Sequence, residues 1–455
     1  MNEIQKALIK LEQTAGEVTS TIIKDLIEEH NNEKERTEKL YKEYKGEVPI
    51  MERKKKAIDE ICNKTANDFR GYIVDTMTGY FLGNPITYSI EKMKEGQGVE
   101  KLRYFLIMND AFNQDKLIGK KAGICGSCPR LLYIDKDGNE RMMNLDPWEV
   151  IFVNDGSIDQ MQYALRYYKV EVQVGGEWKS RNRVEWYDME NISFWIENNE
   201  GNYFPDTTES QNPRPHLFGG VPVIEFQNNE EKQGDFEKVI SLIDAYDADV
   251  SYDQDEHEAF RQSYLILTGV SLGSDENVKK INETRSIEFP ETGATAKFLT
   301  KDVNDTYIEN HKRRLEQNIH KFSRIPDMSD EKFSGDAQTG EARKWKLLGM
   351  ETKAGDKELM FVQALRQQFK LLTQAWAKKN VTVNYLDITF EFTRKLPVEL
   401  SHEAETTGKL KGNVSERTRL GLLSFVDDPE AEIKQMEKET PSVNLDLITE
   451  GINEI

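Results

Sequence analysis

The chain has 455 residues, too many for one ordinary hydrophobic core, so several domains or subdomains are expected. Charged residues make up 31% of it, and no apolar run approaches the ~18 residues of a membrane helix, so we expect a protein used inside the cell without a membrane partner. A formal net charge of −20 excludes a tight DNA binder, which needs clustered Lys and Arg, but still allows a protein that passes DNA without holding it.

The N-terminal part is predicted to be helical. Residues 1–48 are dense in charge, which is typical of a solvated helix or a subunit-contact arm rather than of a core. A longer helix is expected over about 51–89. Gly83 and Pro85 are stop signals there, because Gly favours the turn beyond a helix and Pro does not continue one.

Residues 100–230 are predicted to be mostly β. Strand-like runs recur with turns between them, and Asp137-Gly138 is a strong hairpin signal. Asp135, Asp137 and Gly138 also resemble part of a calcium loop. The glycine spacing and the closing Glu of an EF-hand are absent, so a hairpin turn is favoured.

Three cysteines occur, Cys62, Cys125 and Cys128. The last two form C-G-S-C-P, which is the pattern either of a redox pair or of half a zinc site. A zinc site needs a second pair, and a redox pair normally opens a helix, whereas a strand-like run follows here. Reduced cysteines near a strand or turn are therefore favoured.

Two helices of opposite character are predicted after residue 235. Residues 235–268 place apolar residues at three- and four-residue steps and carboxylates on the opposite face. A small α/β insert interrupts the pattern. A second helix at about 306–323 is locally basic through Lys312, Arg313 and Arg314.

A glycine pattern follows the second helix. Gly335 and Gly340 have the spacing of a Walker A phosphate loop, but Glu341 stands where the Lys is required and no strand leads into the loop. A loop-to-helix junction is favoured, with Ser334 or Asp336 as the cap of the helix that follows.

The C-terminal third is predicted to begin with a long helix that reaches about residue 379. Gly349 and Gly355 lie inside this helix and are natural kink sites. Alternation of apolar and polar residues predicts a strand over 381–393. The end of the chain is again helical, with cap-like starts at 415 and 428.

No catalytic motif is legible. His257-Glu258 and His402-Glu403 each lack the second His of a zinc peptidase motif, and the six histidines are spread along the chain. Carboxylates are too abundant to nominate a catalytic pair. We therefore expect a structural or interaction role, with no enzyme activity, no cofactor and no metal.

The order of these elements resembles the portal proteins of tailed bacteriophages, of the siphophage type that infects Gram-positive bacteria. The segments that carry the resemblance are 67–69, 81–86, 220–229, 242–251, 334–337, 396–397, 414–415 and 425–432. Each segment is weak evidence alone, but their order over residues 60–440 is specific.

The resemblance implies an α+β portal fold in a ring-shaped homo-oligomer, usually a dodecamer, at one vertex of the capsid. The implied regions are a wing (1–234 with strand 381–396), a helical stem (235–268 and 302–323), a small α/β clip (269–301), a tunnel loop (324–336), a long kinked helix (337–380) and a helical crown (397–455).

The implied function is the passage of double-stranded DNA during packaging and ejection. The implied partners are further copies of this chain, a terminase large subunit, scaffolding and major capsid proteins, and a head–tail adaptor. The implied location is the virion, after assembly in the host cytoplasm. The alternatives are another virion or scaffold protein, and a nucleic-acid-processing subunit such as a motor or nuclease.

The resemblance also implies three sets of site residues. The tunnel loop contributes Asp327, Met328, Ser329, Asp330, Glu331, Lys332, Phe333, Ser334 and Gly335. The stem offers Asp247, Asp253, Glu256, Lys312 and Arg313 as channel-lining candidates. The clip offers Asp275, Glu276, Lys279, Lys280, Glu283 and Arg285 for binding terminase or adaptors.

The charges of the two stem helices leave two questions open. The acidic face either lines the channel, where it gives DNA little to grip, or is merely solvated. The basic face around Lys312 and Arg313 either pairs with the acidic helix of a neighbouring copy or faces DNA. Exposed pairs of this kind contribute little individually.

Overall fold

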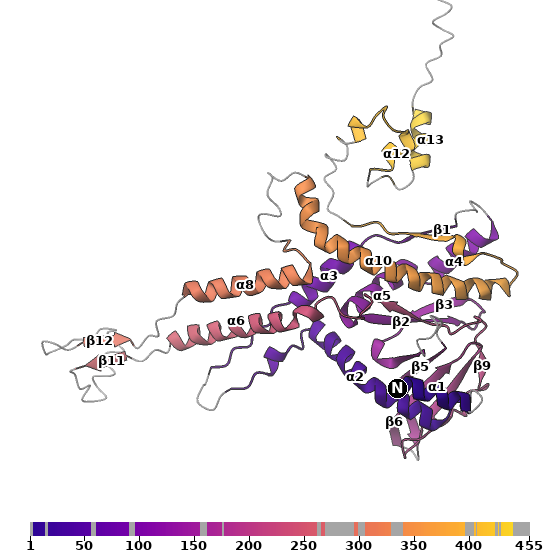
Figure 1. Cartoon of the computed structure of the whole chain (residues 1–455), viewed down its shortest axis with the longest axis horizontal. Coiled ribbons are helices and arrows are strands. Elements are labelled where there is room, and N and C mark those ends of the chain that lie inside the picture. The colour runs from indigo at the N-terminus through magenta and orange to yellow at the C-terminus, as the bar shows by residue number, and fades with distance from the viewer. Residues whose placement is uncertain are drawn as a thin grey trace, which may run out of the picture. The chain divides into compact units, whose positions relative to one another are not determined.

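A computed structural model gives the fold (Figure 1). It describes residues 3–13, 17–55, 61–90, 96–154, 162–174, 177–261, 265–268, 295–298, 305–328, 340–395, 405, 407–423, 426 and 429–439. The chain divides into two compact units, Met1–Arg394 and Lys395–Ile455. Helices and sheets occur together in the first unit, which confirms the α+β class.

Two N-terminal helices cover one face of the largest sheet. They are α1 (Glu3–Gln13) and α2 (Ser20–Tyr44), followed by the short 3₁₀ helix η1 (Pro49–Glu52). Ile23 and Leu26 of α2 are buried against Leu165 and Trp186 of the sheet. The prediction of a solvated arm over 1–48 is therefore wrong: the charges lie on one side, and a narrow apolar stripe on the other side forms a core.

The helix predicted over 51–89 is shorter. The structure has α3 (Phe69–Phe81) and then strand β1 (Thr87–Ile90). The carboxylate of Asp68 caps α3 by accepting the N–H of Gly71, at 2.9 Å. The helix ends before Gly83 and Pro85, which confirms the stop signal.

Residues 97–125 are helical, so the prediction of mostly β structure over 100–230 is wrong at its start. The helices are α4 (Gln97–Met108) and α5 (Ala111–Cys125). Ile118 and Ala122 recur at helical spacing and are buried. Gly126 ends α5 at a φ of +93°, and a side chain there would meet the backbone oxygen of Lys232, so only glycine fits.

Antiparallel sheets account for most of residues 127–227. The six-stranded sheet has the order β4-β5-β6-β7-β8, with β9 paired to β7, and the three-stranded sheet has the order β10-β2-β3. The bounds are β2 (Ser127–Ile134), β3 (Glu140–Asn144), β4 (Val150–Val153), β5 (Tyr163–Val174), β6 (Glu177–Tyr187), β7 (Asn191–Glu197), β8 (Tyr203–Pro205), β9 (Arg214–Pro215) and β10 (Val223–Gln227). The 3₁₀ helix η2 (Pro147–Glu149) precedes β4.

The hairpin predicted at Asp137-Gly138 is confirmed, since β2 and β3 pair antiparallel around it. The Asp135 carboxylate accepts the backbone N–H groups of Asp137 and Asn139, at 3.0 and 2.8 Å. This carboxylate closes the turn, as the hairpin interpretation requires.

The cysteines are free, with Cys125 at the end of α5 and Cys128 in β2. Both thiols are buried. Burial raises the pKa of Cys125 well above its ordinary value and raises that of Cys128 to about 12. The interpretation as reduced cysteines beside a strand is confirmed, and neither thiol is activated for redox chemistry.

The long helix α10 (Gly340–Ala377) packs against β10 and forms much of the largest core. Leu365, Phe369 and Trp376 are buried on its inner face. Figure 1 shows that α10 changes direction along its length. After η4 (Tyr385–Asp387), strand β13 (Ile388–Glu391) pairs with β1, so the strand predicted over 381–393 occupies only part of that range.

The second unit contains two described helices, α12 (Glu416–Leu420) and α13 (Pro429–Glu439). Ser415 caps α12, with its hydroxyl accepting the N–H of Thr418 at 3.3 Å. The cap-like start at 415 is confirmed. Helix α13 begins next to the second cap-like start, but residue 428 itself lies outside the described residues. Within the described helices of the whole chain, none is long and apolar enough to cross a bilayer.

Candidate functional site

The two predicted stem helices lie side by side (Figure 1). They are α6 (Ile240–Arg261), which follows the 3₁₀ helix η3 (Glu237–Val239), and α8 (Asp305–Ser323). Ile243 of α6 and Ile319 of α8 are fully buried in the same core. The helix predicted at about 306–323 is confirmed. The helix predicted over 235–268 is wrong at its C-terminal end, because α6 ends at Arg261 and residues 265–268 form a strand.

Short strands follow α6 and precede α8. They are β11 (Leu265–Thr268) and β12 (Thr295–Phe298), which pair antiparallel with Leu265 opposite Phe298. They bracket most of the residues assigned to the clip. The six clip candidates, Asp275, Glu276, Lys279, Lys280, Glu283 and Arg285, lie outside the described residues.

The carboxylates at the start of the stem are bound within the chain. Asp235 is buried and contacts Lys353 and Lys357 of α10, at 3.1 and 2.7 Å. Burial alone would raise the pKa of Asp235, but the two ammonium groups outweigh it and hold the pKa below its ordinary value. Glu237 pairs with Arg36 of α2, at 2.8 Å.

The next turns of α6 are bound to α3. Arg70 is 1% exposed and contacts Asp244 at 2.5 Å, Asp247 at 3.8 Å and Glu43 of α2 at 3.0 Å. Asp247 is itself 1% exposed, and burial raises its pKa. It is therefore withdrawn from the channel-lining candidates, because its carboxylate lies inside the chain.

An extended segment, residues 63–67, runs along α6 and bonds to it at regular steps. The backbone N–H groups of Asn63, Thr65 and Asn67 donate to side chains of Asp255, Ser251 and Asp247, at 2.6, 3.0 and 2.8 Å.

The spacing of these bonds has a geometric reason. Two residues of extended chain advance about 6.6 Å, and four residues of α-helix advance about 6.0 Å, so alternate residues meet successive helical turns. This segment lies in the range where a helix was predicted over 51–89. Asn, Thr and Asp bond readily outside helices, which favours the extended form.

The basic face of α8 pairs with α6 of the same chain. Lys312 contacts Asp253 at 2.7 Å, and His311 contacts Asp249 at 3.3 Å. Burial would lower the pKa of Lys312, but Asp253 and Glu309 outweigh it and raise the pKa. In this chain, therefore, Lys312 already has an acidic partner, and the acidic face is bound rather than merely solvated.

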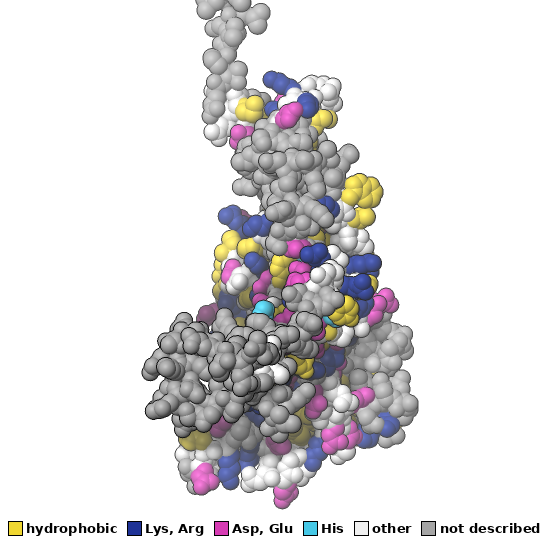
Figure 2. Space-filling model, turned by 90° about the vertical axis from the view of Figure 1, so that its left-hand side faces the viewer, with side chains coloured by type: hydrophobic (Ala, Val, Ile, Leu, Met, Phe, Trp, Pro, Cys, Tyr) yellow, Lys and Arg dark blue, Asp and Glu magenta, His cyan; other side chains and the backbone are white. Residues whose placement is uncertain are grey.

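The remaining stem candidates are at the surface. Glu256 is half-buried and Arg313 is exposed. On the described part of the face in Figure 2, acidic and basic side chains are interspersed. On α6 itself, most carboxylates have a cation or an N–H donor beside them.

The segment after α8 is anchored to α3. The hydroxyl of Tyr72 donates to the carbonyl oxygen of Pro326, at 2.9 Å, and accepts the N–H of Met328, at 2.8 Å. Ile325 is fully buried. Of the nine tunnel-loop candidates, Asp327 and Met328 are described, and Ser329, Asp330, Glu331, Lys332, Phe333, Ser334 and Gly335 lie outside the described residues.

The chain was compared with known proteins. A family model described as phage portal protein, SPP1 Gp6-like, matches residues 23–444. The portal protein of Bacillus phage SPP1 is 24% identical over 472 residues, covering 96% of this chain and 90% of that protein. The portal protein of Clostridium phage phiCD119 is 24% identical over 427 residues, covering 89% and 91%.

These matches define the class as a viral portal protein, a structural component of the phage virion. Within that class, the chain belongs to the SPP1 Gp6-like family of phage portal proteins. The resemblance stated from the sequence is thereby confirmed, and both matched relatives come from phages of Gram-positive bacteria, Bacillus and Clostridium.

Proposed function

We propose that copies of this chain assemble into a ring, of twelve subunits as is usual in portals, at one capsid vertex. Double-stranded DNA passes through its channel during packaging and ejection. The observation that supports this most is the family match over residues 23–444, which spans both stem helices and the segments before and after them. The chain itself carries out no catalytic step, and a separate motor supplies the energy.

The proposed regions keep the bounds that the family resemblance implies. The stem comprises 235–268 and 302–323, the clip 269–301, the tunnel loop 324–336, the long helix 337–380 and the crown 397–455, with the wing in 1–234 and 381–396. Terminase and the head–tail adaptor dock on the clip, and capsid and scaffolding proteins surround the ring.

The charge pairing refines how the stem meets DNA. Asp253, Glu256, Lys312 and Arg313 remain the proposed channel-lining residues. Because Asp253 and Lys312 offset each other, the stem offers DNA a wall of paired charges rather than a continuous acidic face. Such a wall neither neutralises phosphates, which would hold the DNA, nor repels them strongly along its length.

The proposal is tested by mass measurement of the purified chain across protein and salt concentrations, together with an ATPase assay. We expect a discrete species of about twelve subunits and no ATP hydrolysis. A chain that stays monomeric under all conditions contradicts the ring. ATP turnover that is lost on Gly335→Ala or Gly340→Ala substitution favours a motor subunit instead.

A further inference from the structure

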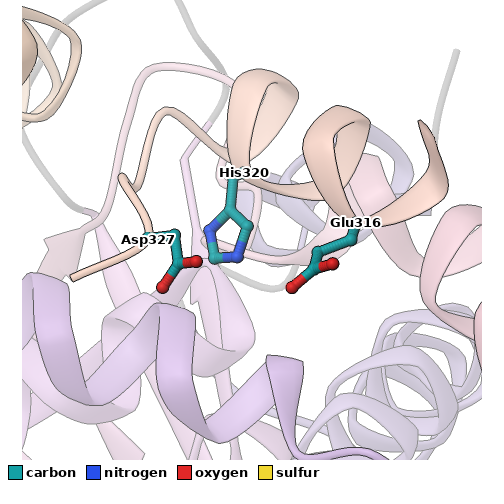
Figure 3. A group of neighbouring side chains, drawn as sticks. All are labelled: Glu316, His320 and Asp327. Atoms are coloured by element: carbon teal, nitrogen blue, oxygen red, sulfur yellow. The ribbon is translucent and has the colours of Figure 1, made fainter. Parts of the chain in front are cut away.

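Three side chains of metal-binding type converge where α8 ends (Figure 3). Glu316 and His320 lie one turn apart on α8, and Asp327 comes from the segment after it. One ligand atom from each lies within 4.8 Å of the other two, and all three residues are half-buried. Figure 3 shows the imidazole of His320 between the two carboxyl groups.

The imidazole is oriented from outside the cluster. Its Nδ1 lies 3.0 Å from the carbonyl oxygen of Ile325, which is only an acceptor, so Nδ1 carries the proton. The lone pair of the neutral ring is then on Nε2. In most histidines that bind a metal, the ring nitrogen that does not contact the ion donates its N–H to a carboxylate, a backbone carbonyl or water, and this hydrogen bond orients the ring.

Aromatic neighbours restrict the same ring further. Phe69 and Tyr72 of α3 meet it edge-to-face, with centroid distances of 5.9 and 5.7 Å. The backbone on either side of Asp327 is also held, because Tyr72 bonds to both Pro326 and Met328. The three ligand groups therefore come from two segments that a third element, α3, keeps together.

We propose that Glu316, His320 and Asp327 bind one divalent transition-metal ion, of the zinc or manganese class. Two carboxylates and one imidazole are a donor set for such ions, with water completing the coordination. Ligand atoms on one tetrahedral zinc lie about 3.3–3.5 Å apart, so modest side-chain rotations from the observed separation close the site. The ion links the end of α8 to the start of the tunnel-loop segment.

The test is isothermal titration of the full chain with ZnCl₂ and, separately, with MnCl₂. We expect one ion per chain for at least one metal, and a loss of about tenfold or more in affinity in Glu316→Gln, His320→Asn and Asp327→Asn. The His320→Asn change is informative because an asparagine amide reaches the position of Nδ1 and keeps a donor for Ile325. Matched controls are His257→Asn, an exposed histidine of α6, and Glu309→Gln, an exposed carboxylate of α8.

Either of two results overturns the site. One is the absence of stoichiometric binding at millimolar metal, and the other is binding that the three variants leave unchanged or that the controls weaken equally. Circular dichroism of each variant shows whether it is folded. If His320→Asn is unfolded, the metal affinity of Glu316→Gln still tests the site. The result is independent of ring formation, so its failure leaves the proposed function untouched.

Discussion

Arg70 is the residue whose loss should matter most to the base of the stem. It is buried and contacts Glu43, Asp244 and Asp247, of which Glu43 and Asp247 are also buried. We predict that Arg70→Leu lowers the free energy of unfolding by about 3–5 kcal/mol, because it leaves uncompensated carboxylates in the interior. Urea denaturation of the variant measures this loss.

Lys39 provides the matched control for Arg70. It also pairs with Glu43, at 3.7 Å, but its side chain is 69% exposed. Solvent screens this pair, so Lys39→Leu should change the free energy of unfolding by less than about 1 kcal/mol. Equal effects of the two substitutions would show that burial does not decide the strength of these contacts.

Asp235 should give the stability a defined pH dependence. Its pKa is lowered in the folded state, so its stabilising effect is present above the ordinary value of 3.8 and is lost as pH falls through the lower, folded value. We predict that the difference in unfolding free energy between the wild-type chain and Asp235→Asn is about 3 kcal/mol at pH 7 and shrinks below pH ~4. Denaturation at several pH values measures it, and a constant difference contradicts the assignment.

At the scale of the element, the ion pair between α6 and α8 can be tested by exchanging its two charges. We predict that Lys312→Glu lowers the stability by about 1 kcal/mol, because it places two carboxylates together, and that adding Asp253→Lys restores most of the loss. Thermal unfolding of the single and double variants measures this coupling. If the double variant is no more stable than the single one, the pair contributes nothing within the chain.

The loop after α8 allows a test of its anchor and a test of its role. We predict that Tyr72→Phe speeds amide exchange at Met328, because the acceptor of that N–H is removed, at a cost of about 1 kcal/mol. Hydrogen exchange measures it, and Tyr44→Phe, which removes an exposed hydrogen bond to Asp75, is the control. If the Met328 amide exchanges equally slowly in Tyr72→Phe and in the wild-type chain, the Tyr72 hydroxyl does not anchor this segment.

The role of the loop concerns DNA. Deletion of 327–333 should spare ring assembly and impair packaging, because the tunnel loop is proposed to protrude into the channel while the helices on either side form the ring. Assembly is measured on the purified protein and packaging by the amount of DNA protected from nuclease. Normal packaging by the deletion counts against the tunnel-loop assignment.

The elements differ in how far the sequence predicts them. Helix α8 and the hairpin at Asp137-Gly138 follow from strong local signals, an apolar stripe and a turn dipeptide. Helices α4 and α5 are not predicted because the strand-like runs after α5 dominate the pattern of residues 100–230. Residues 63–67 are not predicted to be extended because this form depends on contacts with α6, nearly two hundred residues later. Local patterns carry no information on such distant partners.

In the candidate site, too, some features can be predicted from local sequence and others depend on distant contacts. The opposite charges of the two stem helices are visible in the sequence, but which carboxylate meets which cation is set by the packing. Asp247 looks like its neighbours on α6 and is buried only because Asn67 and Arg70 lie against it. Asp327 joins Glu316 and His320 only through the turn that ends α8, so spacing alone does not reveal that cluster.

At the scale of the whole molecule, we propose that this portal protein works as a passive ring. In this proposal, ion pairs within each chain hold the stem helices together, and the charges that face DNA are paired. Family membership supports the ring. Within each chain, α6 contacts α3 and α8, and Asp235, which precedes α6, contacts α10.

The most direct test is cryo-electron microscopy of the purified full-length protein. We predict rings with rotational symmetry and a central channel wide enough for double-stranded DNA, with α6 and α8 of each subunit paired and Lys312 beside Asp253 of its own chain. Particles without a closed ring, or rings in which the channel is lined by a different part of the chain, would contradict it.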